Sequence, residues 1–167
     1  LFSGLATDKL AFKQAGIPVR TVLYCENEPY CQEVLRARIR DGILDDAPIW
    51  PDVRTLNGHP FAGKVGILTA GFPCQPHSVA GKRRGAADER NLWPDTARVI
   101  AEVRPSYVLL ENVPGIIQSQ HGREPYAITV LGDLTRLGYV GRAGIVSARD
   151  VGAPHRRERW WCLAEST

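Results

Sequence analysis

The sequence predicts an α/β domain with a doubly wound, mostly parallel sheet and helices on both of its faces. Two observations support this fold class. Short apolar runs recur along the chain, bounded by Gly, Pro or charged residues, as buried parallel strands are. Amphipathic segments lie between these runs, and strands that alternate with helices form a parallel sheet covered by the helices. In such sheets ligands bind outside the carboxyl ends of the strands.

Each predicted element follows from its own pattern. A first strand is expected to end at Leu1–Phe2, and a helix is expected over Asp8–Ala15. Further strands are expected at the apolar runs Thr21–Cys25, Val65–Ala70, Tyr107–Leu110, Gly144–Ser147 and Trp160–Ala164. Further helices are expected at the amphipathic segments Pro29–Arg40, Leu92–Val103 and Pro125–Leu137. In the last of these, apolar residues recur at helical spacing and Gly138 supplies a C-cap.

The composition of the 167 residues is that of a soluble globular domain, with 44% hydrophobic and 23% charged residues. It excludes a disordered tail, a collagen-like repeat and a disulfide scaffold. No run of about 18 apolar residues predicts a membrane helix, and no signal pattern opens the chain. The four cysteines lack the paired spacing of a zinc site, so we expect reduced thiols in the cytoplasm and no metal. A net charge of +3 is too small to indicate a nucleic-acid partner by itself.

Three features suggest a ligand-binding edge in the first third of the chain. The segment Phe2–Ala6 contains Gly4, which lets backbone approach a nucleotide or nucleoside closely, although a tight turn explains it equally well. Glu26 follows a predicted strand, where a carboxylate can accept both ribose hydroxyls; the alternative is a solvated residue that begins a helix. Asp52 could accept from an adenine amino group. No phosphate-loop Lys is present, so nothing favours a nucleoside triphosphate.

A thiol is predicted at the carboxyl edge of the sheet, because Gly71–Pro76 follows the run Val65–Ala70 and contains Cys74. Prolines on both sides stiffen this turn. Only the thiolate is a good nucleophile, and the basic cluster Lys82–Arg84 downstream would stabilise it. The alternatives are a small buried hydrophobic residue and a metal ligand paired with His77, but no second ligand pair exists.

Two further groups complete this edge. The run Tyr107–Leu110 ends in Glu111 and Asn112, a carboxyl and an amide that need partners if buried, and Glu111 could act as an acid there. Alternation at the start of the last strand places Arg157 and Arg159 on one face, where they could hold a phosphate or a base carbonyl. The alternative for the arginines is a charged strand edge that resists aggregation.

In order and spacing these motifs resemble those of the DNA cytosine-5 methyltransferases over essentially all 167 residues. Phe2–Ala6 is similar to the family's first cofactor motif. Gly71–Ser78 resembles the nucleophile motif, and Arg90–Trp93 resembles the motif that follows it. Glu111–Val113 resembles the glutamate motif and His155–Arg159 the arginine motif.

The resemblance implies a Rossmann-like methyltransferase fold and methyl transfer from S-adenosylmethionine to C5 of a cytosine flipped out of double-stranded DNA. Cys74 would attack C6 of the base, Glu111 would bind and protonate its N3 side, and Arg157 and Arg159 would position the base and a phosphate. The residues implied at the cofactor are Phe2, Ser3, Gly4, Leu5, Glu26, Asn27, Asp52, Val53, Gly71 and Pro73. The residues implied at the DNA or the base are Phe72, Pro73, Gln75, Ser78, Lys82, Arg83 and Asn112.

Five positions depart from the family's pattern. Ala6 and Thr7 stand where Gly or another small residue is usual, and Asn27 stands where a Trp often stacks on adenine. His77 replaces a common Phe, and His155 replaces the usual Gln. None of these changes removes a proposed catalytic group.

Residues 1–167 are interpreted as one partial catalytic domain, since the chain begins with Leu1, contains no Met, and lacks the family's target-recognition region and last motifs. We therefore expect these residues alone to bind cofactor weakly and to methylate poorly. The parent protein is expected to be monomeric and to belong to a bacterial or phage-type restriction-modification system. A second polypeptide that supplies target recognition is one option. Two other functions stay open: a non-catalytic or split-enzyme subunit that binds S-adenosylmethionine, and a tRNA cytosine-5 methyltransferase.

Overall fold

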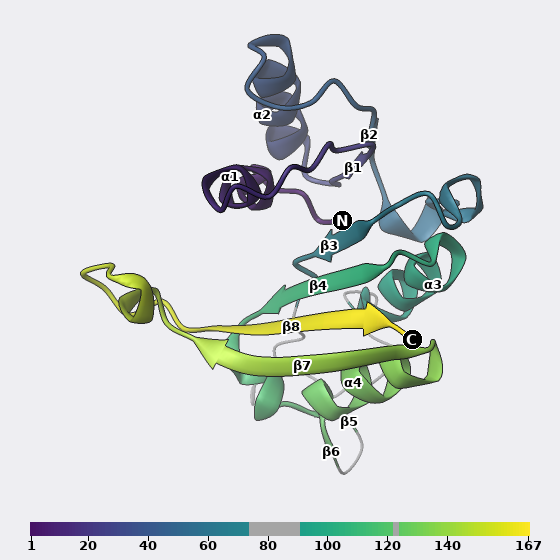
Figure 1. Ribbon diagram of the computed structural model, residues 1–167, viewed down its shortest axis with the longest axis vertical. Coiled ribbons are helices and arrows are strands. Elements are labelled where there is room, and N and C mark those ends of the chain that lie inside the picture. Colours follow the sequence, from purple (N-terminus) through teal and green to yellow (C-terminus); the bar gives the residue numbers. More distant parts are fainter. Residues whose placement is uncertain (74–90, 122–123) are drawn as a thin grey trace. The chain divides into compact units, whose positions relative to one another are not determined.

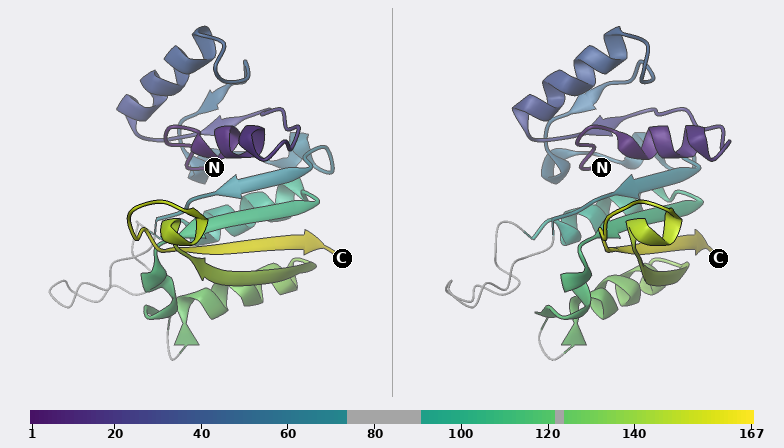
Figure 2. Two further views of the ribbon diagram at one scale, coloured as in Figure 1. Left: turned by 60° about the vertical axis from the view of Figure 1, so that its left-hand side comes forward. Right: turned by 90° about the vertical axis from the view of Figure 1, so that its left-hand side faces the viewer.

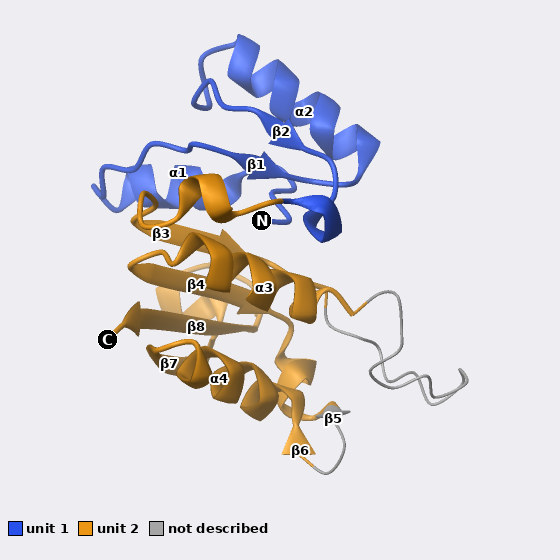
Figure 3. Ribbon diagram, turned by 90° about the vertical axis from the view of Figure 1, so that its right-hand side faces the viewer, with its two compact units in different colours: residues 1–56 blue, residues 57–167 orange. Residues whose placement is uncertain are grey.

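The computed structural model describes residues 1–73, 91–121 and 124–167. Within these residues the chain forms two compact units, Leu1–Leu56 and Asn57–Thr167, which Figure 3 colours separately. Figure 1 labels the helices and strands of both units. None of the described helices combines the length and the hydropathy that crossing a membrane requires.

The first unit consists of α1 (Thr7–Gln14), β1 (Tyr24–Cys25), α2 (Pro29–Arg40), β2 (Ile49–Trp50) and the 3₁₀ turn η1 (Val53–Thr55). β1 and β2 pair in parallel, with Tyr24 opposite Ile49 and Cys25 opposite Trp50. Its hydrophobic core consists of Ala6, Tyr24, Leu35, Leu44 and Ala47. Leu35 is the buried residue of α2, so this helix packs on the core through one face.

The boundaries in this unit follow local chemistry. α2 has the predicted bounds because Pro29 occupies its first turn, where the backbone N–H has no partner in the helix. β1 is shorter than the run Thr21–Cys25 because the N–H of Thr21 donates to the Asp45 carboxylate at 2.7 Å. The expected strand end at Leu1–Phe2 is absent, since Phe2 has a φ of 54°, outside the extended region.

The second unit contains one larger sheet, in the order β3, β4, β8, β7. Its strands are β3 (Ile67–Ala70), β4 (Tyr107–Asn112), β7 (Tyr139–Val146) and β8 (Arg159–Ser166), and its helices are α3 (Trp93–Val103) and α4 (Tyr126–Arg136). The 3₁₀ turns are η2 (His59–Phe61), η4 (Pro114–Ile117) and η5 (Ala148–Val151), and β5 (Gln120–His121) pairs with β6 (Glu124–Pro125).

Both α3 and α4 cover the same face of this sheet, as the opposite views of Figures 2 and 3 show. Val99 and Ile100 of α3 and Val130 and Leu134 of α4 are buried. Apolar residues at this helical spacing form one stripe on each helix, which packs on the strands. The helices described in the second unit therefore lie on one side of its sheet.

Three strands of this sheet, β3, β4 and β7, share one direction, as a mostly parallel sheet requires, and β8 is reversed. β3 and β4 are parallel, but β8 runs antiparallel to both β4 and β7. Parallel neighbours need a crossover, usually a helix, whereas residues 147–158 turn back through η5. The N–H of Ala148 donates to the carbonyl of Arg157 at 3.3 Å, which closes this connection as a long hairpin.

Leu110 belongs to the core of the second unit, since it is 0% exposed and lies on the buried face of β4. Replacing Leu110 with Ala is expected to lower the free energy of unfolding by about 2–5 kcal/mol, because a cavity remains in the core. Urea unfolding measures this change. Leu163→Ala is the matched control, since Leu163 on β8 is 51% exposed. Equal losses in the two variants would contradict the assigned core.

Candidate functional site

Glu26 is the centre of the candidate site in the first unit. It follows β1 directly, is 8% exposed, and accepts hydrogen bonds from two backbone N–H groups. Its Oε2 accepts from Gly4 at 2.6 Å and its Oε1 from Glu28 at 2.9 Å. The structure therefore brings the predicted Gly-containing segment and the predicted carboxylate together, although they lie 22 residues apart in the chain.

Three residues before α1, Phe2, Gly4 and Ala6, have positive φ values. Gly4 has a φ of 49°, and a Cβ there would meet nothing within 4 Å. Ser3 donates from its N–H to the carbonyl of Cys25 at 2.9 Å, and its Oγ accepts from the N–H of Cys25 at 3.1 Å. Ala6 also has a positive φ, of 52°, which costs an L residue about 1–2 kcal/mol. Glycine would avoid this cost at position 6.

Leu5 and Asn27 lie at the same edge of the first unit. Leu5 is 41% exposed, and its carbonyl accepts from the guanidinium of Arg38 on α2. Asn27 is exposed and stands between Glu26 and the start of α2. Neither side chain is buried in the core of the unit, so both are open to a ligand.

Asp52 caps the turn η1 at the end of β2. Its Oδ1 accepts from the N–H of Arg54 at 2.9 Å, and its Oδ2 pairs with Nη2 of the same arginine at 2.7 Å. The hydrogen bond from the Arg54 side chain is the main reason that the pKa of Asp52 is lowered. Val53 is buried beneath this turn. The pairing with Arg54 was missed by sequence reasoning, although the spacing Asp-x-Arg at a turn was a usable signal.

In the second unit, Glu111 and Arg159 form an ion pair. Arg159 Nε lies 2.8 Å from Glu111 Oε1, and the two side chains are 22% and 33% exposed respectively. Because β8 is antiparallel to β4, its first residue lies beside the carboxyl end of β4. The Glu111 carboxyl is therefore partly exposed and paired with a cation. A carboxyl and a guanidinium side by side can bind a planar group that has both donors and acceptors.

The ends of β3 and β4 are in contact through Gly71, Phe72 and Asn112. A Cβ on Gly71 would lie 3.2 Å from Glu111 Oε2, so the missing side chain lets the backbone approach the carboxyl. Asn112 is buried, and its Nδ2 donates to the carbonyl of Phe72 at 2.9 Å. Its Oδ1 accepts from the N–H of Val113 at 2.8 Å, so the buried amide is satisfied on both sides.

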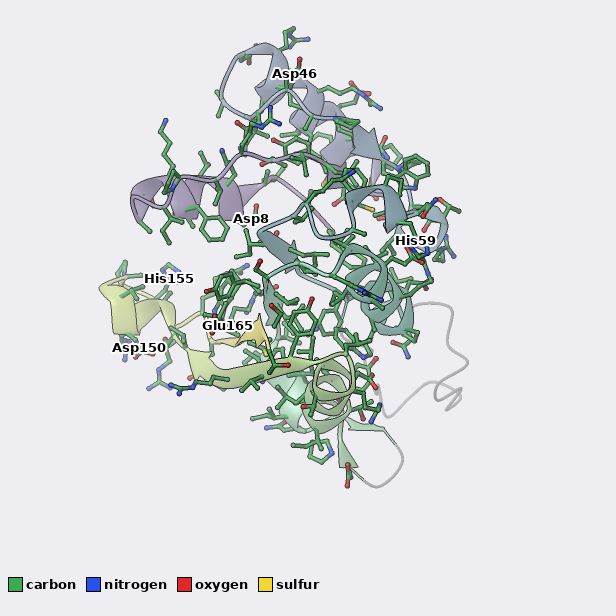
Figure 4. The ribbon with its side chains drawn as sticks, turned by 45° about the vertical axis from the view of Figure 1, so that its right-hand side comes forward. Asp8, Asp46, His59, Asp150, His155 and Glu165 are labelled. Carbon is green, nitrogen blue, oxygen red and sulfur yellow. The ribbon has the colours of Figure 1, made fainter. Side chains whose placement is uncertain are left out.

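Arg157 lies in the β7–β8 connection rather than on the strand. β8 begins at Arg159, so strand alternation does not relate the two arginines. Arg157 is exposed. The connection is ordered by Ser147 and Asp150, which form a reciprocal capping box at η5. Figure 4 labels Asp150 and His155 within it.

Cys74, Gln75, Ser78, Lys82 and Arg83 lie outside the residues that the structure describes. Pro73, which is exposed, is the last described residue before them. Among the described thiols, burial raises the pKa of Cys25 and of Cys162 to about 11. Partial desolvation, with Glu26 and Glu28 nearby, also raises the pKa of Cys31. No described thiol is thus suited to act as a thiolate near neutral pH, and the described residues contain no cluster suited to a metal ion.

The family model of the C-5 cytosine-specific DNA methylases matches residues 1–166 of the chain. The chain belongs to this family. Type II methyltransferase M.NlaX of Neisseria lactamica is 35% identical over 160 residues, which are 95% of this chain and 49% of that protein. M.HhaI of Haemophilus parahaemolyticus is 32% identical over 164 residues, 98% of this chain and 47% of that protein. The chain thus spans about half the length of these curated relatives.

Solved structures show the same fold. The Dnmt2 methyltransferase of S. pombe matches with a TM-score of 0.77 and 27% identity, over 99% of this chain and 49% of that one. A putative DNA modification methyltransferase encoded within an E. coli prophage matches with a TM-score of 0.73 and 25% identity, over 99% and 45%. The predicted family and the predicted α/β methyltransferase fold are confirmed.

Proposed function

We propose that the protein transfers the methyl group of S-adenosylmethionine to C5 of cytosine in DNA, through a covalent bond between Cys74 and a flipped-out base. Membership of the C-5 cytosine-specific methylase family supports the reaction class. One structural observation carries the residue assignment: the Glu111–Arg159 pair lies beside Gly71, which stands three residues before Cys74 in the chain.

The residues of the first unit fit the proposed cofactor. Glu26 keeps free lone pairs after accepting from two N–H groups, because a carboxylate offers about four acceptor positions. It would accept the ribose hydroxyls, and Asp52 would accept from the adenine amino group. The open space beside Gly4 leaves room for backbone to contact a ligand. When bound, S-adenosylmethionine supplies an electrophilic methyl group.

The chain's own residues then carry the chemistry. The Cys74 thiolate would add to C6 of cytosine, while Glu111 donates a proton at the N3 side, which makes C5 nucleophilic. After methyl transfer, C5 loses its proton to a base, and elimination breaks the C6–S bond and restores the thiolate. Arg159 would hold Glu111 and the base in one plane, and Arg157 would contact a neighbouring phosphate.

Transfer of tritium from methyl-labelled S-adenosylmethionine tests this function. The polypeptide that carries these residues, as its gene encodes it, is assayed with duplex DNA and tRNA in parallel. We expect tritium on cytosine C5 of the DNA and none on the tRNA. Tritium on the tRNA and none on the DNA would instead identify the protein as a tRNA cytosine-5 methyltransferase. Activity that requires a protein encoded next to it would indicate a split enzyme. Absence of transfer in every mixture would contradict the proposal.

Replacing Glu26 with Ala is expected to weaken S-adenosylmethionine binding by about 10-fold to 100-fold, since each hydrogen bond to a charged group contributes roughly 1.5–3 kcal/mol. Isothermal titration calorimetry measures the change. Glu28→Ala is the matched control, because Glu28 is exposed and its side chain does not cap α2. Glu26→Gln keeps an acceptor for Gly4 and separates loss of structure from loss of binding. Equal affinity in Glu26→Ala and Glu28→Ala would exclude Glu26 from the site.

A further inference from the structure

We infer that Asp133 and Tyr126, both on α4, are positioning residues for the strand end that leads to Cys74. Neither residue belongs to the motifs that carry the family resemblance. The inference rests on the proposed function, because the role of Cys74 gives this strand end its importance. Contacts within the second unit support it.

Asp133 orients Trp93 at the start of α3. Its Oδ2 accepts from the indole Nε1 of Trp93 at 2.7 Å, across 40 residues of sequence. Trp93 is 2% exposed, so its N–H needs a partner inside the protein. The other oxygen of Asp133 pairs with Arg136, one turn further along α4. The carboxylate is thus held by two donors, and it fixes the direction of the indole N–H.

Trp93 in turn holds Phe72. The two ring centroids lie 5.1 Å apart with planes tilted by 44°, an arrangement that aromatic pairs favour. Phe72 is also 2% exposed, and its carbonyl accepts from the buried Asn112 amide at 2.9 Å. The ring of Phe72 is therefore fixed by α3 and its backbone by β4. Since Phe72 stands two residues before Cys74, these contacts set the point at which the chain leaves β3.

Tyr126 contacts Asn91, the first described residue after the segment 74–90. Its hydroxyl donates to Oδ1 of Asn91 at 2.6 Å, and the same oxygen accepts from the N–H of Trp93 at 3.3 Å. Both polar contacts from α4 thus converge on residues 91–93. Residues 91–93 are linked to Phe72 through Trp93, so contacts join the described residues on the two sides of the segment 74–90. Phe72 is also bound by Asn112, the neighbour of Glu111 on β4.

The rate of covalent capture of duplex DNA that carries 5-fluorocytosine tests this role. We expect Asp133→Ala and Tyr126→Phe to slow capture by about 10-fold to 100-fold, as small displacements of reacting groups do, with little change in DNA affinity. Asp133→Asn keeps an acceptor for the indole and is expected to restore most of the rate.

Tyr139→Phe is the matched control. It loses the hydrogen bond from a buried tyrosine hydroxyl to the carbonyl of Pro105, 2.7 Å long, near the opposite end of β4. We expect this variant to capture DNA at the wild-type rate. Wild-type capture by Asp133→Ala, or an equal slowing by Tyr139→Phe, would overturn the inference.

NMR of the side-chain N–H groups tests the same coupling without any reaction. In Asp133→Ala we expect the resonances of both the Trp93 indole and the Asn112 amide to shift, because Phe72 links them. A shift of the indole alone would show that α4 does not act on Phe72, and the inference would fail. If the wild-type protein captures no DNA while the Asn112 amide still shifts, the proposed function fails and the positioning of Phe72 stands.

Discussion

Replacing Cys74 with Ser is expected to abolish the covalent complex with duplex DNA that carries 5-fluorocytosine. With S-adenosylmethionine present, methyl transfer leaves a C5 that carries fluorine and methyl but no proton. A base then has no proton to remove, elimination cannot break the C6–S bond, and the enzyme stays attached to the base. A serine hydroxyl is not ionised near neutral pH and is a far weaker nucleophile than a thiolate. Denaturing gel electrophoresis of the protein with labelled DNA measures the complex.

Cys31→Ser is the matched control for this experiment, because Cys31 is a partly exposed thiol on α2. We expect Cys31→Ser to form the complex as the wild-type protein does. A complex that survives in Cys74→Ser would rule out Cys74 as the nucleophile. Loss of the complex in both variants would instead indicate that the cysteine substitutions disturb folding.

Replacing Glu111 with Gln is expected to lower kcat for methyl transfer by about 10²-fold to 10⁴-fold, the usual contribution of a positioned acid. Glutamine has nearly the same shape and can still accept from Arg159 Nε, so the strand ends should keep their arrangement. It has no carboxyl proton to donate to the N3 side of the base. Steady-state transfer of tritiated methyl groups measures the effect.

Glu165→Gln provides the control for this substitution. Glu165 lies near the far end of β8, where its Oε1 accepts from the hydroxyl of Tyr107 at 3.0 Å. The same chemical change is therefore made in the same sheet, away from the proposed catalytic groups. A kcat in Glu111→Gln within twofold of that in Glu165→Gln would remove Glu111 from the mechanism.

Local signals predicted much of the fold. Pro29 and the amphipathic pattern that follows it predicted α2 with its observed bounds, because helix starts depend on residues close in sequence. The direction of β8 was not predictable in the same way. An apolar run indicates burial, but it does not indicate which strand lies beside it or in which direction that strand runs. The hairpin formed by residues 147–158 settles the direction, and its turn chemistry was not recognised.

The same distinction between local signals and long-range contacts applies to the candidate site. Glu26 and Glu111 were predicted at strand ends, because a carboxylate after an apolar run lies at the edge of the sheet. Their partners were not, since the hydrogen bond from Gly4 and the ion pair with Arg159 join residues that are distant in sequence. The hydrogen bond between Trp93 and Asp133 joins residues 40 positions apart and produces no periodic pattern in the sequence. Such contacts depend on tertiary packing, which a single sequence does not display.

The reversed direction of β8 has a consequence for the connection between β7 and β8. The connection of residues 147–158 leaves and rejoins the sheet at the edge where β4 ends in Glu111 and Asn112. Arg159 is held by the ladder between β7 and β8, which begins at its pairing with Val146. Surface connections tolerate insertion and sequence change far better than paired strands do. A longer or differently charged connection would therefore change what approaches the edge that carries Glu111, while Arg159 and Glu111 stay in register.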